Sequence, residues 1–372
     1  MDSPAQAECG FCYRVFSVLS NSLKHCVYRI WLAVMLIYGL LLIPQGVFAR
    51  QLGVNTKVSG LRRSGWGPLH VTVSSPLQQK RLAFMHESPE LPPPGSWRFR
   101  TGLTMANVWI FNEQKLMVDE DVWTLNQSAE YAVNDRFAVS ARLPLQYLGG
   151  GFTDSFVEAF HDAAGVGNAK REQFPRNRIR MNAVQPDGKV RNIVNDGEGS
   201  VMARAPVISA KFRLNSPQAD FPLTLKASLD IPRLEKKTNL VERSGNDWAL
   251  ALASAYRFSE HLAGTASYAL IRSREGTLFK TGDLKDRQIS AMASLDYQVT
   301  DSAAVIVQLL RESAVAEGTQ TGFDLHTVEL ILGMKVRISE DTVWEFAFVE
   351  NIAVRDNSAD FALHAAISTT LN

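Results

Sequence analysis

The feature that most constrains the fold is a two-residue alternation of apolar and polar side chains, which recurs from residue 96 to the C-terminus. It divides into about twelve segments of roughly 10–12 residues each. In residues 222–231, for example, leucine, alanine and isoleucine alternate with threonine, lysine, serine and aspartate. A period of two gives a β-strand one apolar and one polar face. The chain is therefore predicted to be an all-β protein.

The lengths of the connections indicate how the strands are wired. Short turns such as Asn134-Asp135 and Thr300-Asp301 alternate with longer polar stretches such as 111–118 and 148–203. Asparagine and aspartate favour tight turns because their side chains bond the local backbone. An even number of strands, with short turns on one side and long loops on the other, is typical of a transmembrane barrel. The expected strands are residues 96–110, 119–133, 136–147, 204–214, 222–231, 247–258, 262–273, 287–298, 302–313, 325–338, 341–352 and 360–371.

The positions of the aromatic residues separate a membrane barrel from a secreted β-sandwich. On the apolar face of the first strand, Trp97 and Phe99 lie at the short-turn end, and Trp109 and Phe111 lie at the other end. Aromatic side chains at both strand ends form the girdles found at lipid–water interfaces. A sandwich core would concentrate them in mid-strand. We therefore expect a transmembrane antiparallel up-and-down β-barrel of about twelve strands, residues 96–372.

Residues 1–49 are predicted to be a secretory signal peptide that is cleaved after Ala49. Lys24 and Arg29 precede the uncharged apolar run 30–43, which is shorter than the ~20 residues of a transmembrane helix. Small side chains stand at the third and first positions before the cut. A membrane anchor is the alternative. All three cysteines lie in this segment, so the mature chain is expected to have no thiol chemistry.

The charge of the mature chain is balanced. Removing residues 1–49 takes three basic and two acidic side chains from the 39 and 38 of the whole chain, which leaves 36 of each. A nucleic-acid partner is not expected, because it would require a basic surface. Residues 50–95 are irregular and contain the stiff run 91–95, so they are predicted to be a periplasmic tail or a plug that enters the barrel.

Some sequence blocks are shared with a known family. They are Ser75-Pro76-Leu77-Gln78, Leu91-Pro92-Pro93-Pro94-Gly95-Ser96-Trp97, Gly149-Gly150-Gly151-Phe152, Phe156-Val157-Glu158-Ala159-Phe160-His161 and Phe174-Pro175-Arg176-Asn177-Arg178. With these blocks the chain resembles uncharacterised outer-membrane proteins of Gram-negative bacteria, catalogued as a domain of unknown function. The resemblance implies a barrel in the outer membrane, in contact with outer-membrane lipid and, during biogenesis, with the barrel-assembly machinery. It implies no activity.

The long loop 148–203 is a candidate constriction. A helix beginning near Thr153 or Asp154 would present an apolar stripe, and a basic cluster follows it. In one interpretation the loop folds into the barrel mouth, where arginine would meet anionic solute or lipid phosphate. In the other it caps the exterior. The candidate constriction residues are Phe152, Phe156, Phe160, His161, Arg176 and Arg178.

Charged side chains on the inward face are the candidate pore lining. They are Arg98, Arg100, Arg142, Arg213, Lys226, Asp230, Asp296, Glu329, Lys335, Arg337, Glu345 and His364. Twelve strands lie between barrels filled by side chains and barrels with an aqueous channel. The basic excess predicts a narrow channel for small hydrophilic, anionic solutes. Ion pairs that close the lumen of a structural barrel are the alternative.

Catalysis is the weaker interpretation. A lipid-modifying or lipid-binding enzyme of the outer membrane would need a serine–histidine pair on the lipid-facing surface, and neither that pair nor a GxSxG motif is present. Its candidate histidines would be His364 or His161. Glu158, His161 and Asp162 lack the spacing of a zinc site. We therefore predict neither a cofactor nor a metal nor a catalytic residue.

Overall fold

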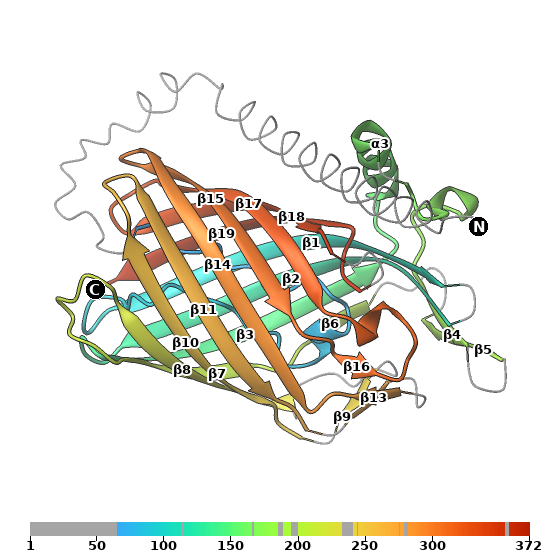
Figure 1. Ribbon diagram of the computed structural model, residues 1–372, viewed down its shortest axis with the longest axis horizontal. Helices are drawn as coiled ribbons and strands as arrows, with labels where there is room; N and C mark the ends of the chain where they lie inside the picture. Colours follow the sequence, from blue (N-terminus) through green and yellow to red (C-terminus); the bar gives the residue numbers. More distant parts are fainter. Residues whose placement is uncertain are drawn as a thin grey trace, which may run out of the picture. The chain divides into compact units, whose positions relative to one another are not determined.

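The computed structural model shows a closed β-barrel (Figure 1). It describes residues 65–112, 115–165, 167–184, 189–194, 200–232, 241–243, 245–274, 276–278, 282–353 and 357–372. Its twelve wall strands are β1 (Trp97–Asn112), β2 (Leu116–Ala132), β3 (Phe137–Gly149), β7 (Val207–Arg213), β8 (Leu223–Asp230), β10 (Trp248–Arg257), β11 (Leu262–Arg272), β14 (Arg287–Thr300), β15 (Ala303–Glu312), β17 (Thr327–Arg337), β18 (Thr342–Asn351) and β19 (Phe361–Leu371). The expected signal peptide lies outside the described residues.

The wall closes between its first and last strands. Each wall strand pairs antiparallel with its neighbours in the chain, and β1 pairs with both β2 and β19. Trp97 at the start of β1 faces Leu371 near the end of β19. The predicted all-β, up-and-down barrel of twelve strands is therefore confirmed.

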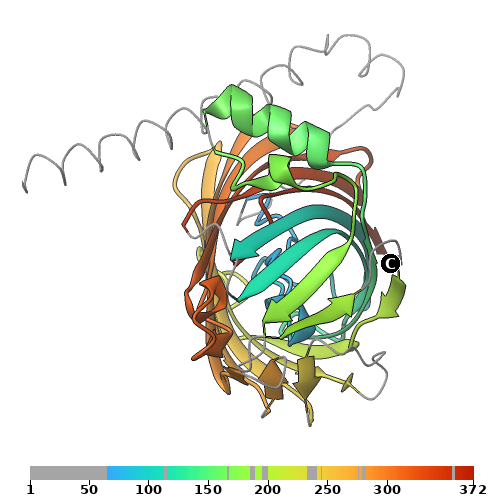
Figure 2. The same cartoon turned by 90° about the vertical axis from the view of Figure 1, so that its right-hand side faces the viewer.

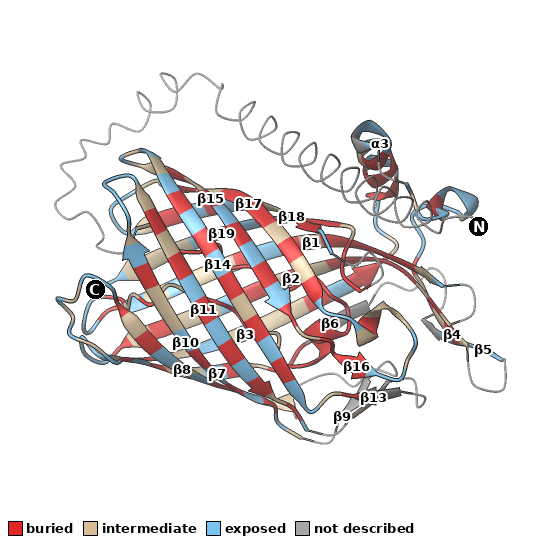
Figure 3. Ribbon diagram, in the orientation of Figure 1, coloured by how far each residue is buried: buried red, intermediate tan, exposed pale blue. Residues whose placement is uncertain are grey.

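Alternating burial follows the strands and separates the two faces of the wall (Figure 3). In β10, Leu250 is 43 % exposed, whereas the next residue, Ala251, is 2 % exposed. Large apolar side chains such as Leu309, Phe346 and Leu363 are exposed on the outward face of other strands. A soluble monomer does not expose a continuous apolar band of this kind, whereas the wall of a transmembrane barrel must do so.

The long-loop end differs from the sequence-based expectation in two ways. The connection 111–118 was expected to be long, but β1 and β2 continue to Asn112 and Leu116 and form a tight hairpin. Trp109 was expected at a lipid interface, yet it is only 2 % exposed and packs against Phe174, with 5.3 Å between the ring centroids. The loop 148–203 therefore covers part of this aromatic girdle.

Segments of the long loops form further strands. A hairpin of β4 (Arg180–Val184) and β5 (Val190–Val194) extends from β2, and β6 (Ser200–Ala203) pairs with β3. A separate four-stranded sheet combines three other loops. Its strands are β9 (Val241–Arg243), β12 (Gly276–Leu278), β13 (Gly282–Leu284) and β16 (Ala316–Glu317). The short 3-10 helix η4 (Gly322–Asp324) follows β16.

Residues 155–173 belong to a compact unit that is separate from the barrel. This unit holds most of helix α3 (Asp154–Ala164) and the 3-10 helix η2 (Arg171–Gln173). No helix among the described residues is long and apolar enough to cross a membrane.

Residues 65–95 lie inside the barrel, where Figure 2 shows them in blue within the ring of strands. We call this segment the plug hairpin. Its entering limb, residues 65–77, rises from the short-turn end of the wall. The 3-10 helix η1 (Gln78–Lys80) lies near the long-loop end, and the returning limb, residues 81–95, leads back to β1. Gly67 and Ser88 bring the two limbs into contact.

Candidate functional site: a plugged lumen

The entering limb is extended and uses its two faces differently. Leu69, Val71 and Val73 are buried in the large apolar cluster that fills the long-loop half of the lumen. The intervening residues His70 and Ser74 hydrogen-bond the wall instead. Each fully buried aliphatic side chain of this kind contributes about 1.5–3 kcal/mol. This limb is therefore held by apolar packing as well as by polar contacts.

Glu345 is the main polar anchor of the entering limb. Its carboxylate accepts a hydrogen bond from the backbone N–H of His70 at 3.1 Å, and the ring Nδ1 of His70 lies 2.7 Å away. The ammonium of Lys335 lies 3.4 Å from the same carboxylate and donates to the carbonyls of Trp66 and Pro68. Two charged wall residues thus fix the backbone of the limb.

The start of the entering limb is fixed around Trp66. Asp296 accepts its backbone N–H at 2.9 Å, and the guanidinium of Arg337 lies 4.9 Å from its ring centroid. Further along, Glu329 accepts the backbone N–H of Ser74 at 2.7 Å. These predicted lumen residues do face inward, and each contacts the plug hairpin.

The returning limb contacts the opposite part of the wall. Arg81 lies 3.4 Å from Asp247, whose backbone N–H in turn donates to Asp230 at 2.8 Å. Arg142 donates to the carbonyl of Ala83 at 2.5 Å. The limb is thus fixed to β3 and to the residues that adjoin β8 and β10.

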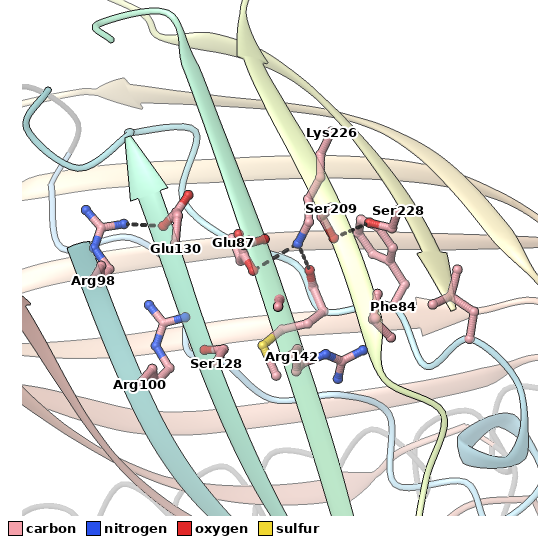
Figure 4. A pocket seen from close by; sticks show the side chains of 15 residues that line it. Phe84, Glu87, Arg98, Arg100, Ser128, Glu130, Arg142, Ser209, Lys226 and Ser228 are labelled. Carbon is pink, nitrogen blue, oxygen red and sulfur yellow. Dashed lines mark hydrogen bonds and ion pairs between the residues drawn. The ribbon is translucent and has the colours of Figure 1, made fainter. Parts of the chain in front are cut away.

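Glu87 is the centre of an ion-pair network in the returning limb, of which Figure 4 shows Glu87, Lys226, Arg98 and Glu130. Its two carboxylate oxygens lie 2.9 Å from Lys226 Nζ and 3.0 Å from Lys211 Nζ. Lys211 also pairs with Glu130 at 2.9 Å, and Glu130 pairs with Arg98 at 3.1 Å. Because such charge-assisted bonds are short and directional, the network fixes side chains from β1, β2, β7 and β8 around one plug residue.

Two other side chains complete the path of the returning limb. The ring of His86 lies between Ser267 and Ser290, at 2.9 and 2.7 Å. Glu90 pairs with Arg213 at 2.5 Å, closer to the short-turn end. His86, Glu87 and Glu90 of this limb are therefore each bonded to inward-facing wall residues.

Two small cavities lined by described residues lie beside the returning limb, each of about 20 Å³. One lies between Glu87 and the wall strands β1, β2, β3, β7 and β8; the other lies nearer the long-loop end. Arg142 lines both of them. A space of about 10–15 Å³ holds one water molecule, so solutes larger than water do not fit in this conformation.

The walls of these cavities are mainly basic. The charged lining of the first is Arg98, Arg100, Arg142 and Lys226 against Glu87 and Glu130. The charged lining of the second is Arg81, Arg142 and Arg204 against Asp230. The Nε atom of Arg100 is buried and has no hydrogen-bond partner among the described residues. The polar side of the lumen is therefore an electropositive strip.

The candidate constriction residues are divided between the barrel unit, which holds Phe152, Arg176 and Arg178, and the separate unit of residues 155–173. Helix α3 begins at Asp154, so Phe152 precedes it, contrary to the expected three-residue stripe. The Phe152 ring lies 6.2 Å from that of Trp123, on the outward face, and is 67 % exposed. Arg176 and Arg178 are exposed. Their role in a constriction stays a prediction.

Within the separate unit, three of the candidate residues contact each other or a nearby side chain. The rings of Phe156 and Phe160 stack with centroids 6.5 Å apart, and His161 Nδ1 lies 3.1 Å from the side-chain oxygen of Asn168.

The glycine-rich motif at the start of the loop has a packing role. Gly151 has φ of +58°, and a Cβ there would overlap the carboxylate of Asp121. That carboxylate accepts hydrogen bonds from Asn107 at 2.8 Å and Thr153 at 2.6 Å. Asp154 accepts the backbone N–H of Asn177 at 2.6 Å. Thr153 and Asp154 are therefore tied to the barrel rim through Asp121 and Asn107, and Asn177 is tied to Asp154.

The histidine considered for lipid chemistry lies inside the barrel. His364 is 4 % exposed and contacts the hydroxyl of Thr104 at 2.8 Å. It does not face lipid, as an enzyme acting on membrane lipid would require. Within the described parts of the chain, no three histidine, cysteine or acidic side chains are grouped as a metal site would need.

Sequence reasoning missed the residues of the plug hairpin that contact the wall. A signal was present, because Leu69, Val71 and Val73 alternate with polar residues just as the wall strands do. The charged residue Glu87 gave no such signal, since its importance depends on which lysines lie opposite it in the lumen.

Fold and site together define a transmembrane β-barrel whose lumen is occupied by its own N-terminal segment. The chain belongs to the protein family of unknown function DUF3187, whose model matches residues 49–370. No curated protein matches it.

Several solved barrels are similar in outline. An outer-membrane channel from Pseudomonas putida F1 has 13 % identity and a TM-score of 0.49 over 76 % of this chain and 97 % of that one. The NanC porin has 7 % identity and a TM-score of 0.42 over 74 % and 100 % of the two chains. The P. putida toluene transporter TodX has 9 % identity and a TM-score of 0.38 over 84 % and 97 %.

Proposed function

We propose that the protein is an outer-membrane channel that conducts small hydrophilic anions alongside its plug hairpin. The observation that carries the proposal is the electropositive strip beside the returning limb, with a cavity on each side of Arg142. Basic side chains along a narrow aqueous path favour anions. The entering limb is packed into an apolar cluster, so an aqueous path for ions opens more easily beside the returning limb.

The described conformation is the closed state of this proposed channel. Its cavities admit water only, and the network around Glu87 holds the returning limb against the wall. Conduction requires this limb to move by enough to join the two cavities, while the apolar half of the plug hairpin stays in place. Local opening of this kind costs less than expulsion of the whole plug, because fewer buried apolar contacts are lost.

Planar-bilayer recording of the mature protein tests the proposal. In a salt gradient the reversal potential should show that anions permeate more readily than cations. Arg142→Glu should shift the reversal potential toward cation selectivity. Arg136→Glu is the matched control, because Arg136 is an exposed cation in the turn between β2 and β3.

Two outcomes would overturn the channel. One is an unchanged selectivity in Arg142→Glu with normal folding, which would mean that ions do not pass this strip. The other is the absence of conductance both in the native protein and in Glu345→Ala, in which the plug has lost an anchor. The barrel would then be a closed structural one.

A further inference from the structure

We propose that Lys211 and Lys226 form a carboxylate-binding site in the lumen, which Glu87 of the plug hairpin occupies in the closed protein. The inference rests on the proposed function and names its substrate class, small organic anions that carry a carboxylate. A solute carboxylate would replace Glu87 between the two ammonium groups and so release the returning limb.

The register of the wall supports this site. Lys211 on β7 and Lys226 on β8 are direct cross-strand partners. Two like charges in these positions repel each other, which destabilises the strand pair unless an anion lies between them. Their side chains are only 6 % and 11 % exposed, so solvent screens the repulsion weakly. The strand pair β7–β8 therefore requires an anion between these two lysines.

The geometry of Glu87 indicates which anion fits. Each carboxylate oxygen has its own ammonium, at 2.9 Å from Lys226 and 3.0 Å from Lys211. A planar group with two oxygens is thus matched by two donors. Lys226 and Glu87 line the first cavity together with Arg100 and Arg142 (Figure 4). A solute carboxylate reaches the site through this cavity when the returning limb moves and widens it.

The two lysines differ in what remains when Glu87 leaves. Lys211 keeps Glu130 as a partner at 2.9 Å. Lys226 has no other carboxylate partner among the described residues; its other contacts, the carbonyl of Met85 at 3.3 Å and the Phe84 ring at 5.3 Å, also belong to the returning limb. A buried charge without a counter-ion is costly. Movement of the returning limb is therefore favoured when an incoming carboxylate takes the place of Glu87, and disfavoured otherwise.

Binding of radiolabelled acetate to the purified, folded full-length protein tests the site. Glu87→Ala removes the internal carboxylate that competes with the ligand. Acetate should therefore bind this variant about tenfold more tightly than the native protein, a difference in binding free energy of about 1.4 kcal/mol. Adding Lys226→Met to Glu87→Ala should abolish the gain. Glu90→Ala is the matched control, because Glu90 lies on the same limb but pairs with the single cation Arg213.

An equal gain in acetate affinity in Glu90→Ala would overturn the site. So would a gain in acetate affinity that persists when Lys226→Met is added to Glu87→Ala. Equal competition by inorganic phosphate or chloride would also overturn it, because the site would then select charge and not a carboxylate.

A measurement on the native protein covers the case in which Glu87→Ala does not fold. The open probability of single channels should rise with acetate and saturate, but should not rise with chloride at the same ionic strength. An open probability independent of acetate would contradict the proposal. Acetate binding in the absence of any conductance would instead retain the site and overturn the channel.

Discussion

Glu345 on β18 binds both the backbone N–H and the ring of His70, a residue 275 positions earlier in the chain. This contact joins the plug hairpin to β18, the last wall strand but one in the chain. Glu345→Ala removes this contact together with the ion pair to Lys335, and the loss of a buried ion pair should cost about 3–5 kcal/mol. We expect trypsin to cleave after Lys80 or Arg81 much faster in this variant than in the native protein. Glu345→Gln keeps an acceptor, so its rate of tryptic cleavage should lie between those of the native protein and Glu345→Ala. Equal resistance of all three proteins to trypsin would rule out the anchoring role.

The apolar packing of the entering limb can be tested separately. Leu69 is fully buried and its side chain lies against Gly333. Leu69→Ala should lower the free energy of unfolding by about 2–5 kcal/mol, as for other buried leucines. The heat-induced shift in gel mobility measures this, and Leu143→Ala is a suitable control because Leu143 is exposed on the outward face. A loss no larger than that of the control would mean that the limb is not packed as described.

Gly151 is expected to tolerate no side chain. Gly151→Ala would force a Cβ into the Asp121 carboxylate and hold alanine at φ of +58°, at a cost of about 1–3 kcal/mol. The loop 148–203 should then become more sensitive to proteases. Gly167→Ala should have no such effect, because nothing lies within 4 Å of a Cβ at that position. Similar proteolysis of the two variants would argue against the tie between loop and rim.

The constriction predicted for the long loop calls for a deletion. Removing residues 155–173 leaves Asp154, which accepts a hydrogen bond from Asn107 of β1, and Phe174, which packs against Trp109. If the loop narrows the entrance, conductance should rise and anion preference should fall in planar bilayers. Unchanged conductance and selectivity would mean that the loop caps the exterior. The strand pairing should survive either way, since the deletion includes no ladder residue.

Periodicity predicted the wall well because every strand carries its own two-residue pattern. The expected strand 287–298 corresponds to β14, Arg287–Thr300, and the inward parity placed Asp296 and Glu345 in the lumen as the structure has them. The ion pairs were not predictable. The partner of Lys226 is Glu87, on a limb that has no strand register, and only the folded path of the plug hairpin brings them together.

The separate four-stranded sheet of β9, β12, β13 and β16 escaped prediction for a different reason. Short strands such as β9 and β16 are two or three residues long, which is too few for an alternating pattern to be recognised, and they are held by partners from other loops.

The two limbs of the plug hairpin are tied to parts of the wall that lie far apart in the chain. Glu87 and Glu90 bind β7 and β8, whereas His70 binds β18, near the end of the chain. The seam between β1 and β19 joins the first wall strand to the last. A wall that closes at this seam with the plug hairpin in place encloses Lys211 and Lys226 together with their counter-ion, so neither ammonium group faces the lumen without a carboxylate.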